Sequence, residues 1–343
     1  MMSEHRQGGD TRGLATGVID LASCVNPYGP PPAAVAALQS LDVSTLRGHP
    51  YGASDDVLSA MSDYLGVSAE ELTAGRGISG LLWALRDAAR GAGLKVHVPR
   101  PAYTEFRDAF GLASTPSRTR LQVEDIEVGL ADGAIVVIAN PENASGVALP
   151  REALVDLAAR FPRAWLVVDE SYVDFVADPS ALTLVGHAPP NVSVLRSISK
   201  FHGLAGVRVG VAWSNGRLPD LLAPAGPWPT SRIDAILLTA AVSDYEWVQE
   251  SRVQLESDQR WLDQLLLEQG LRVVPGSRTQ TRLIVGAPDD LGDRLLTQGI
   301  RVRALSTSHG LKPAGFRIVP PHSCLRHRVR FALRAALASV LPT

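Results

Sequence analysis

The sequence predicts an α/β protein, with a mostly parallel sheet between helices and a smaller α+β domain beside it. Two continuous apolar runs of strand length, residues 134–139 and 164–168, are each followed by polar residues, and helix-like segments alternate with them. Short, wholly apolar strands separated by helices are typical of a parallel sheet covered on both faces. In such sheets the functional groups gather at the carboxyl ends of the strands.

The first two thirds of the chain supply the predicted sheet and its helices. Residues 55–65 are amphipathic and predict a helix, and residues 79–90 predict another helix after a glycine-rich turn. The predicted strands of this part are residues 95–98, 134–139, 164–168, 192–195 and 208–213. We therefore expect one large domain at residues 46–228.

The remainder of the chain predicts the smaller domain. A proline-rich junction at residues 221–229 precedes long helices over residues 231–270. The other elements expected here are strands at residues 271–274, 282–285 and 316–319, and helices at residues 289–298 and 325–341. We expect a small domain at residues 229–343 that residues 1–45 join, with a frayed tail at residues 1–17.

Composition argues against several classes of protein. A chain of 343 residues can bury a large core, and its net charge of −2 argues against nucleic-acid binding. The apolar runs are shorter than the roughly 18 to 20 residues that cross a bilayer, and the N-terminus has no signal-peptide centre. We therefore expect a cytoplasmic protein without membrane contact. Cys24 and Cys324 form no metal quartet and are expected to be free thiols.

Lysine is rare in this chain, so any lysine chemistry has three candidates: Lys95, Lys200 and Lys312. Lys200 alone follows two hydroxyls, Ser197 and Ser199, at the end of a predicted strand, and Arg208 lies eight residues further on. Hydroxyls and a guanidinium recognise a phosphate monoester, and a lysine among them can form a Schiff base with an aldehyde. Together they indicate pyridoxal phosphate, although a lysine in this position, taken alone, more often ends a strand and faces solvent.

Two other strand ends carry groups that suit a pyridine ring. Asp169 ends one apolar run, and Tyr172 follows three residues later. A carboxylate keeps a pyridine nitrogen protonated, which makes the ring an electron sink. The phenol, and the amide of Asn143 in the turn after residues 134–139, can hydrogen-bond the oxygen on the ring. An aspartate at a strand end and an asparagine in a turn are also common without any cofactor.

The glycine-rich turn at residues 75–80 leads directly into a predicted helix. Free backbone N–H groups and the helix dipole make such a turn an anion site. The turn also spells G-x-G-x-x-G, which in dinucleotide-binding proteins follows an apolar strand and precedes an acidic residue by about 20 positions. Residues 69–74 include two glutamates, and the next strand is followed by Pro99 and Arg100. We therefore set the nicotinamide alternative aside.

Five motifs, in this order, resemble those of the fold-type I pyridoxal-phosphate enzymes of the class I/II aminotransferase group. They are Asn-Pro-Tyr-Gly from Asn26, Asn-Pro-x-Asn-x-x-Gly from Asn140, Asp-Glu-x-Tyr from Asp169, Ser-x-Ser-Lys from Ser197 and Leu-Ala-Gly-x-Arg from Leu204. The ordered set is specific, although no single motif is, and the match covers nearly the whole chain. The chain is most similar to the histidinol-phosphate aminotransferase branch, with the threonine-phosphate decarboxylases close to it.

The resemblance implies pyridoxal 5′-phosphate as the cofactor and a role for each matching residue. Lys200 would form the Schiff base and carry the proton, and Asp169 would pair with the pyridine nitrogen. Asn143 and Tyr172 would hold the ring oxygen, and Tyr103 would stack on the ring. The phosphate would be bound by Gly77, Ile78, Ser79, Ser197, Ser199 and Arg208.

The resemblance also implies substrate contacts and a homodimer with shared active sites. Arg317 would bind the α-carboxylate of the substrate, and Asn26, Tyr28 and Trp228 are further candidates for substrate binding. His49 stands where the family has a tyrosine that reaches the cofactor phosphate of the partner subunit, and Trp228 stands where the branch has another tyrosine. These departures lead us to expect poor activity with histidinol phosphate itself.

We expect a transaminase (EC 2.6.1.-) that moves an amine between a small-molecule donor and acceptor by ping-pong transamination. The substrate would be an amino acid or an amino-acid-like amine. A decarboxylase, or another lyase of a phosphorylated or specialised amino acid, stays an alternative, because the sequence does not show which substrate bond stands perpendicular to the ring. A non-catalytic sensor is disfavoured, because Lys200 is present and no DNA-binding segment is fused to the chain.

Overall fold

The structure is a computed structural model that describes residues 13, 15–216, 222, 226–306 and 309–338. The strands are β1 (Ile19–Asp20), β2 (Leu72–Gly75), β3 (Val96–His97), β4 (Ile135–Ala139), β5 (Trp165–Asp169), β6 (Val192–Arg196), β7 (Gly210–Trp213), β8 (Arg282–Val285), β9 (Ile300–Arg301), β10 (Arg303–Leu305) and β11 (Gly315–Ile318). The helices are α1 (Pro32–Gln39), α2 (Ala53–Leu65), α3 (Gly77–Gly91), α4 (Thr104–Phe110), α5 (Val123–Ala131), α6 (Arg151–Arg160), α8 (Arg232–Val242), α9 (Tyr245–Glu268), α10 (Leu291–Thr297) and α11 (Arg326–Ala338). Short 3₁₀ helices are η1 (Val43–Arg47), η2 (Ala69–Glu71), η3 (Val173–Phe175) and η5 (Ser323–Leu325).

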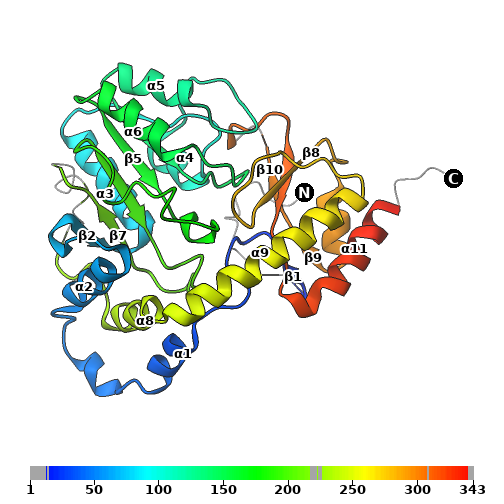
Figure 1. Ribbon diagram of the computed structural model, residues 1–343, viewed down its shortest axis with the longest axis horizontal. Helices are drawn as coiled ribbons and strands as arrows, with labels where there is room; N and C mark the ends of the chain where they lie inside the picture. Colours follow the sequence, from blue (N-terminus) through cyan, green and yellow to red (C-terminus); the bar gives the residue numbers. More distant parts are fainter. Residues whose placement is uncertain (1–12, 14, 217–221, 223–225, 307–308, 339–343) are drawn as a thin grey trace.

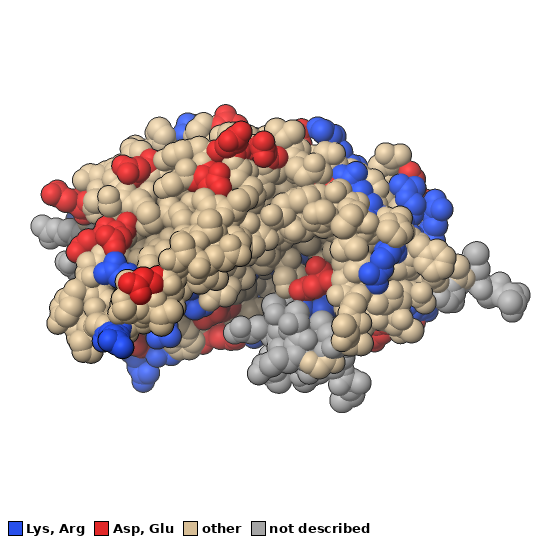
Figure 2. All heavy atoms as spheres, turned by 90° about the horizontal axis from the view of Figure 1, so that it is seen from below, with Lys and Arg blue, Asp and Glu red and all other residues tan. Residues whose placement is uncertain are grey.

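A six-stranded sheet forms the centre of the larger part of the molecule (Figure 1). Its strand order is β2-β7-β6-β5-β4-β3, and β3 to β6 run parallel, whereas β7 is antiparallel to both of its neighbours. The mostly parallel sheet between helices that the sequence predicts is therefore confirmed. On the face seen in Figure 2, acidic and basic side chains are scattered among uncharged ones.

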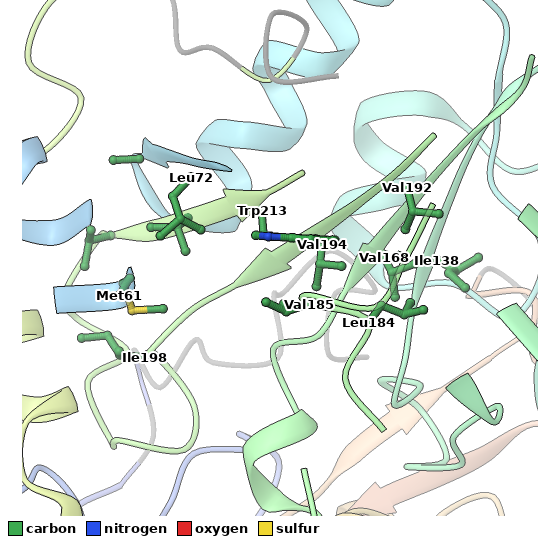
Figure 3. Packing of buried hydrophobic residues seen from close by; sticks show 14 of the residues in the cluster. Met61, Leu72, Ile138, Val168, Leu184, Val185, Val192, Val194, Ile198 and Trp213 are labelled. Carbon is green, nitrogen blue, oxygen red and sulfur yellow. The ribbon is translucent and has the colours of Figure 1, made fainter. Parts of the chain in front are cut away.

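The central strands are apolar on both sides because helices cover both faces of the sheet. Alternate residues of β5 illustrate this, since Val168 joins the cluster with Trp213 whereas Val167 packs with Leu81 of α3. Figure 3 shows the first cluster, in which side chains from several strands meet Met61 of α2. This packing fixes the strand ends against one another.

The smaller part of the molecule combines an antiparallel sheet, in the order β10-β11-β8, with α9, α10 and α11. The N-terminal segment joins it, because β1 pairs in parallel with β9. Helix α8 packs with the cluster of the large sheet, through Leu238 and Ala241 among others. The domain boundaries stay predictions, and this packing favours a boundary after α8 rather than at residue 229.

The structure differs from the sequence predictions at two strands: among the described residues, one expected strand is absent, and one that was not expected is present. Residues 271–274 form no strand, since one isolated bridge joins Val273 to Ile284 before Pro275 and Gly276 end the pairing. Strand β2 does precede the glycine-rich turn, contrary to the sequence interpretation. It is a four-residue edge strand beside β7, and its Thr73 interrupts the apolar pattern that would have indicated it. A dinucleotide site would also need an acidic residue at the end of the next strand. Strand β3 is instead followed by Val98, Pro99 and Arg100, so this argument against a dinucleotide site holds.

Some expectations fall outside the described residues. These are most of the frayed tail, part of the junction at residues 221–229 and the end of the last helix beyond residue 338. Both cysteines are free, as expected, with Cys24 buried and Cys324 exposed. No helix within the described ranges is long and apolar enough to cross a membrane.

Candidate active site

Three neighbouring strands end together at one edge of the large sheet. The register places Ala139 of β4 opposite Asp169 of β5, and Asp169 opposite Leu195 of β6. A cleft of about 90 Å³ opens there, lined by Ile78, Tyr103, Ala139, Asn143, Asp169, Ser171, Tyr172, Ser197, Ser199, Lys200, Ala205 and Arg208. All of these except Ala139, Ser171 and Ala205 are residues that the sequence analysis selects. Parallel strands thus bring together side chains that lie far apart in the chain.

Lys200 follows β6 and faces this cleft. Burial lowers the pKa of its ammonium group, and the cations Arg317 and Arg208 lower it further, while Asp169 opposes the shift. Its backbone is held by the N-terminal segment, because the N–H of Asn26 donates to the carbonyl of Lys200 at 2.9 Å. A lysine with a lowered pKa has more of the neutral amine that acts as a nucleophile or base.

Asp169 ends β5 as a buried carboxylate. It accepts hydrogen bonds from the backbone N–H and the hydroxyl of Ser171, at 2.8 and 2.5 Å. Burial raises its pKa, whereas these bonds and the nearby Lys200 lower it. The sequence analysis did not select Ser171, although its place two residues after Asp169 is one from which a hydroxyl commonly bonds an aspartate.

Asn143, Tyr172 and Arg317 form one hydrogen-bonded group beside the cleft. The Asn143 amide donates to the Tyr172 hydroxyl at 2.8 Å. Arg317 Nη1 donates to the side-chain oxygen of Asn143 at 2.6 Å and to its carbonyl at 3.0 Å, and Nη2 donates to the carbonyl of Ala22 at 2.9 Å. Burial alone would lower the pKa of Arg317, but Cys24 and Tyr172 raise it, so the guanidinium stays charged.

Another group of residues in the cleft suits an anion. The hydroxyls of Ser197 and Ser199 lie 2.6 Å apart, and the guanidinium of Arg208 forms no ion pair with any described residue. Gly77 begins α3 at a φ of 67°, and a Cβ there would lie 3.0 Å from Arg208 Nη2. Hydroxyls, a guanidinium and a helix N-terminus together provide the donors that bind a phosphate. Ser79 lies in the same first turn of α3 but is absent from the cleft lining.

A second cleft, of about 40 Å³, adjoins the first and shares Tyr103 and Asn143 with it. Arg317 and Arg303 both line this second cleft, and they are directly opposite each other on β11 and β10. Burial and the nearby Arg317 lower the pKa of Arg303. His309 also lines this cleft, where burial and Arg303 lower its pKa to about 4, so the ring is neutral at pH 7.

The sequence analysis missed Arg303, and a cross-strand pattern could have indicated it. Strands that pair directly place opposite residues on the same face, so a partner of Arg317 on the preceding strand would share its cleft. That inference needs the register of β10 and β11, which the short segments between residues 300 and 318 do not reveal on their own.

Asn26 and Tyr28 lie against α9 and are absent from the lining of both clefts. The Asn26 amide donates to the Ser251 hydroxyl at 2.8 Å. The Tyr28 hydroxyl donates to Asp258 at 2.7 Å, and its ring lies 4.5 Å from that of His322. Their polar groups bond α9 in this structure, and the Asn26 backbone also bonds the Lys200 carbonyl. Their expected substrate-binding roles stay predictions.

His49 and Trp228 are also absent from the lining of both clefts. Their rings stack at 4.3 Å with an angle of 14° between their planes, and Tyr51 meets Trp228 edge-on. Trp228 has a φ of 58°, which a residue with a Cβ seldom adopts, and this position remains 40% exposed. The pair is therefore a surface feature of the single chain.

Comparisons with known proteins agree with this geometry. The family model described as "Aminotransferase class I and II" matches residues 16–327. A histidinol-phosphate aminotransferase from Trichormus variabilis is 36% identical over 262 residues, which cover 72% of this chain and 73% of the relative.

Two solved structures have the same fold. The histidinol-phosphate aminotransferase from Sinorhizobium meliloti, solved in complex with pyridoxal-5′-phosphate, has a TM-score of 0.80 at 23% identity and covers 94% of this chain and 92% of that one. An L-threonine-O-3-phosphate decarboxylase from Porphyromonas gingivalis has a TM-score of 0.76 at 17% identity, covering 94% and 100%. The family match, the fold and the cleft at the strand ends agree: the chain belongs to the class I and II aminotransferases.

Proposed function

We propose that this aminotransferase acts on an amino acid, or an amino-acid-like amine, that carries a second anionic group. The observation that carries this proposal is the placement of Arg303 opposite Arg317 in the cleft that adjoins Lys200. Guanidinium groups recognise carboxylates and phosphates in a bidentate manner, so two of them in one cleft suit a substrate with two anionic groups. Arg317 would hold the α-carboxylate, and Arg303 the second anion.

Pyridoxal phosphate is the cofactor of this family, and the residues at the first cleft fit it. Arg208, Ser197 and Ser199 would bind its phosphate with the N-terminus of α3, and the small Gly77 leaves room for it. Asp169 would pair with the ring nitrogen, and Tyr103 would stack on the ring. When bound, this group supplies an electron sink for a bond at the substrate Cα.

The chain's own groups would then position the substrate and move its proton. Lys200 Nζ would accept the proton from the substrate Cα in one half-reaction and return a proton in the other. Its lowered pKa supports this role, since the neutral amine is the proton acceptor. Arg317 would orient the substrate, and its bonds to Asn143 tie that orientation to the group that holds the ring oxygen.

The alternative activity is decarboxylation or another lyase reaction of a phosphorylated or specialised amino acid. The same residues serve both reactions, because the bond that breaks is set by how the substrate is oriented over the ring. The complete Leu-Ala-Gly-x-Arg motif at residues 204–208 favours transamination.

We also propose a homodimer, located in the cytoplasm. The exposed apolar side chains Val35, Leu38, Val43 and Leu46 lie on α1 and η1, which precede the stacked pair of His49 and Trp228 in the chain. Figure 2 views the molecule from the side of α1 in Figure 1 and shows broad uncharged areas there. An apolar surface of this kind typically marks a protein contact, and a second copy would bring His49 and Trp228 close to its neighbour's cleft.

A screen of amino donors tests the substrate proposal. The yellow holoenzyme would be mixed with single donors, and loss of its visible absorption band would be followed while released CO2 is assayed. We expect donors with a carboxylate and a second anionic group to bleach the band without CO2 release, and histidinol phosphate to react poorly. Brisk turnover of histidinol phosphate would contradict the proposed substrate class, and stoichiometric CO2 would favour the decarboxylase. A protein that ignores added pyridoxal phosphate would refute the whole assignment.

A further inference from the structure

Glu142 is a buried carboxyl group in the turn that carries Asn143. The turn runs from the end of β4 to Gly146, and it is closed by backbone bonds from Glu142 N to the Val147 carbonyl at 2.8 Å and from Gly146 N to the Glu142 carbonyl at 2.9 Å. Glu142 is 6% exposed, and its side chain bonds Ser145 within the same turn. A carboxyl group is costly to bury, so its contacts must offset that cost.

One oxygen of Glu142 holds two neighbouring segments together. Oε2 accepts a hydrogen bond from the Ser145 hydroxyl at 2.9 Å, which lies within the same turn. It also accepts a hydrogen bond from the backbone N–H of Leu121 at 3.2 Å, which lies just before α5. The carboxylate therefore fastens the turn to an adjacent segment of the large domain.

The other oxygen, Oε1, is buried and has no hydrogen-bond partner among the described residues. Glu142 lines a small cavity of about 10 Å³ whose other walls are apolar, apart from Tyr103 and Asn143. Burial raises the pKa of Glu142 to about 7, while its bonds to Ser145 and Leu121 oppose the shift.

The turn held by Glu142 sets the place of two groups in the active site. Asn143 donates to the Tyr172 hydroxyl, and its two oxygen atoms accept both hydrogen bonds from Arg317 Nη1. Arg317 is fixed at its other end by the carbonyl of Ala22. A shift of the turn would therefore move one of the two supports of Arg317 and would turn its guanidinium in the cleft.

We propose that Glu142 is a positioning residue for the carboxylate-binding arginine, which it supports through the Asn143 turn. The proposal rests on the assignment of Arg317 to the substrate carboxylate. Glu142 touches neither the substrate nor the reacting atoms, and it acts through Asn143 on the orientation of Arg317.

The test uses succinate, a simple dicarboxylate, as a probe of the Arg317 site in the holoenzyme. Its dissociation constant is measured from the change that it causes in the visible absorption of the bound cofactor. For Glu142→Ala we expect at least a tenfold rise in that constant, with cofactor affinity changed less than threefold. Glu142→Gln should stay within threefold of the wild type for both, because its amide oxygen can accept the same two bonds. Glu152→Ala, the same change at an exposed glutamate, should have no effect.

The outcomes separate this proposal from the proposed function. A wild-type enzyme that does not bind succinate would overturn the role of Arg317 and this proposal with it. Succinate binding that is unchanged in Glu142→Ala, or weakened only as much as cofactor binding, would overturn the positioning role alone. If Glu142→Ala does not fold, Ser145→Ala removes one of the two bonds and should raise the succinate constant by clearly more than threefold.

Discussion

The proposed role of Asp169 separates cofactor binding from turnover. The Asp169 carboxylate accepts hydrogen bonds from Ser171 at the end of β5, and it lines the same cleft as Lys200 and Arg208 without bonding to either. We predict that Asp169→Ala keeps the visible band of the bound cofactor and loses about 10- to 100-fold in kcat, the value of one charge-assisted hydrogen bond. Lys200→Ala, by contrast, should lose the band. Unchanged turnover in Asp169→Ala would contradict the role of this carboxylate.

His202, two residues after Lys200, gives a prediction for pH dependence. Its ring is fully buried beside Trp247 and Tyr64, and neither ring nitrogen has a hydrogen-bond partner among the described residues. Burial lowers its pKa to about 4, with Arg196 and Arg252 adding to the shift and Asp174 opposing it. In the unfolded chain His202 binds a proton as the pH falls below about 6.5, whereas in the folded protein it stays neutral down to about pH 4. Protonation therefore favours the unfolded state, and the free energy of unfolding falls as the pH is lowered from 6.5 towards 4.

We predict that His202→Phe, which keeps a ring in the aromatic cluster, flattens this acid dependence. Between pH 7.5 and pH 5 the variant should lose about 2 kcal/mol less unfolding free energy than the wild type, since each pKa unit is worth about 1.4 kcal/mol. Urea unfolding at both pH values measures this, and the contributions of all other groups cancel in the comparison. Equal losses in the two proteins would show that the pKa of His202 is not lowered in the folded protein.

Residue identities explain why much of the site, but not all of it, could be predicted from the sequence. Lys200, Asp169 and Asn143 each follow an apolar strand, so local pattern alone places them at one sheet edge. Arg303 joins the site through a strand pairing between β10 and β11 that no local pattern reveals. Glu142 and His202 could not be predicted for another reason, because their behaviour depends on burial, which only the packed structure determines.

At the scale of elements, the buried strands β4, β5 and β6 are the ones that the sequence predicts well. They are covered on both faces, so their apolar character is continuous and unambiguous. Strand β2 lies at the sheet edge and carries Thr73, and the segment at residues 271–274 is apolar yet pairs by a single bridge. Both errors arise where pairing partners, rather than the local sequence, decide whether a strand forms.

The loop after Lys200 depends on a close contact between two glycines. Gly203 has a φ of 68°, and a Cβ on it would lie 2.6 Å from the Cα of Gly29 in the N-terminal segment. We predict that Gly203→Ala destabilises the protein by about 2 kcal/mol or more and weakens cofactor binding. The added Cβ would push the loop away from the N-terminal segment, which would strain the hydrogen bond from the Asn26 N–H to the Lys200 carbonyl.

Gly206→Ala in the same loop is the matched control for this prediction. No atom lies within 4 Å of a Cβ at Gly206, so that variant should change the free energy of unfolding by less than about 0.5 kcal/mol. Thermal unfolding and cofactor titration of both variants measure the difference. Equal stability of the two variants would mean that the backbone contact between Gly29 and Gly203 is not required.

At the scale of the whole molecule, α9 connects the segments that build the site. Figure 1 shows this helix running along the molecule from α8 towards β9 and α11. Its Ser251 binds Asn26, its Arg252 lies 3.8 Å from the buried Asp174, and its Asp258 binds Tyr28. The N-terminal segment and η3 are therefore bound to α9, and Leu262 and Leu265 of this helix share a buried cluster with Phe316 and Ile318 of the small sheet.

The assembly of two copies is the last prediction at this scale. We predict that the wild type elutes at twice the chain mass of 36.5 kDa, and that Leu38→Glu combined with Leu46→Glu weakens the dimer at least tenfold. These side chains are 51% and 43% exposed, so two buried charges would disrupt an interface without disturbing the core of one chain. Activity of the double variant should fall on dilution together with the dimer fraction. Phe331→Glu, at a 72% exposed residue on α11, is the control and should remain dimeric. A fully active wild-type monomer would show that neither cleft needs a second copy.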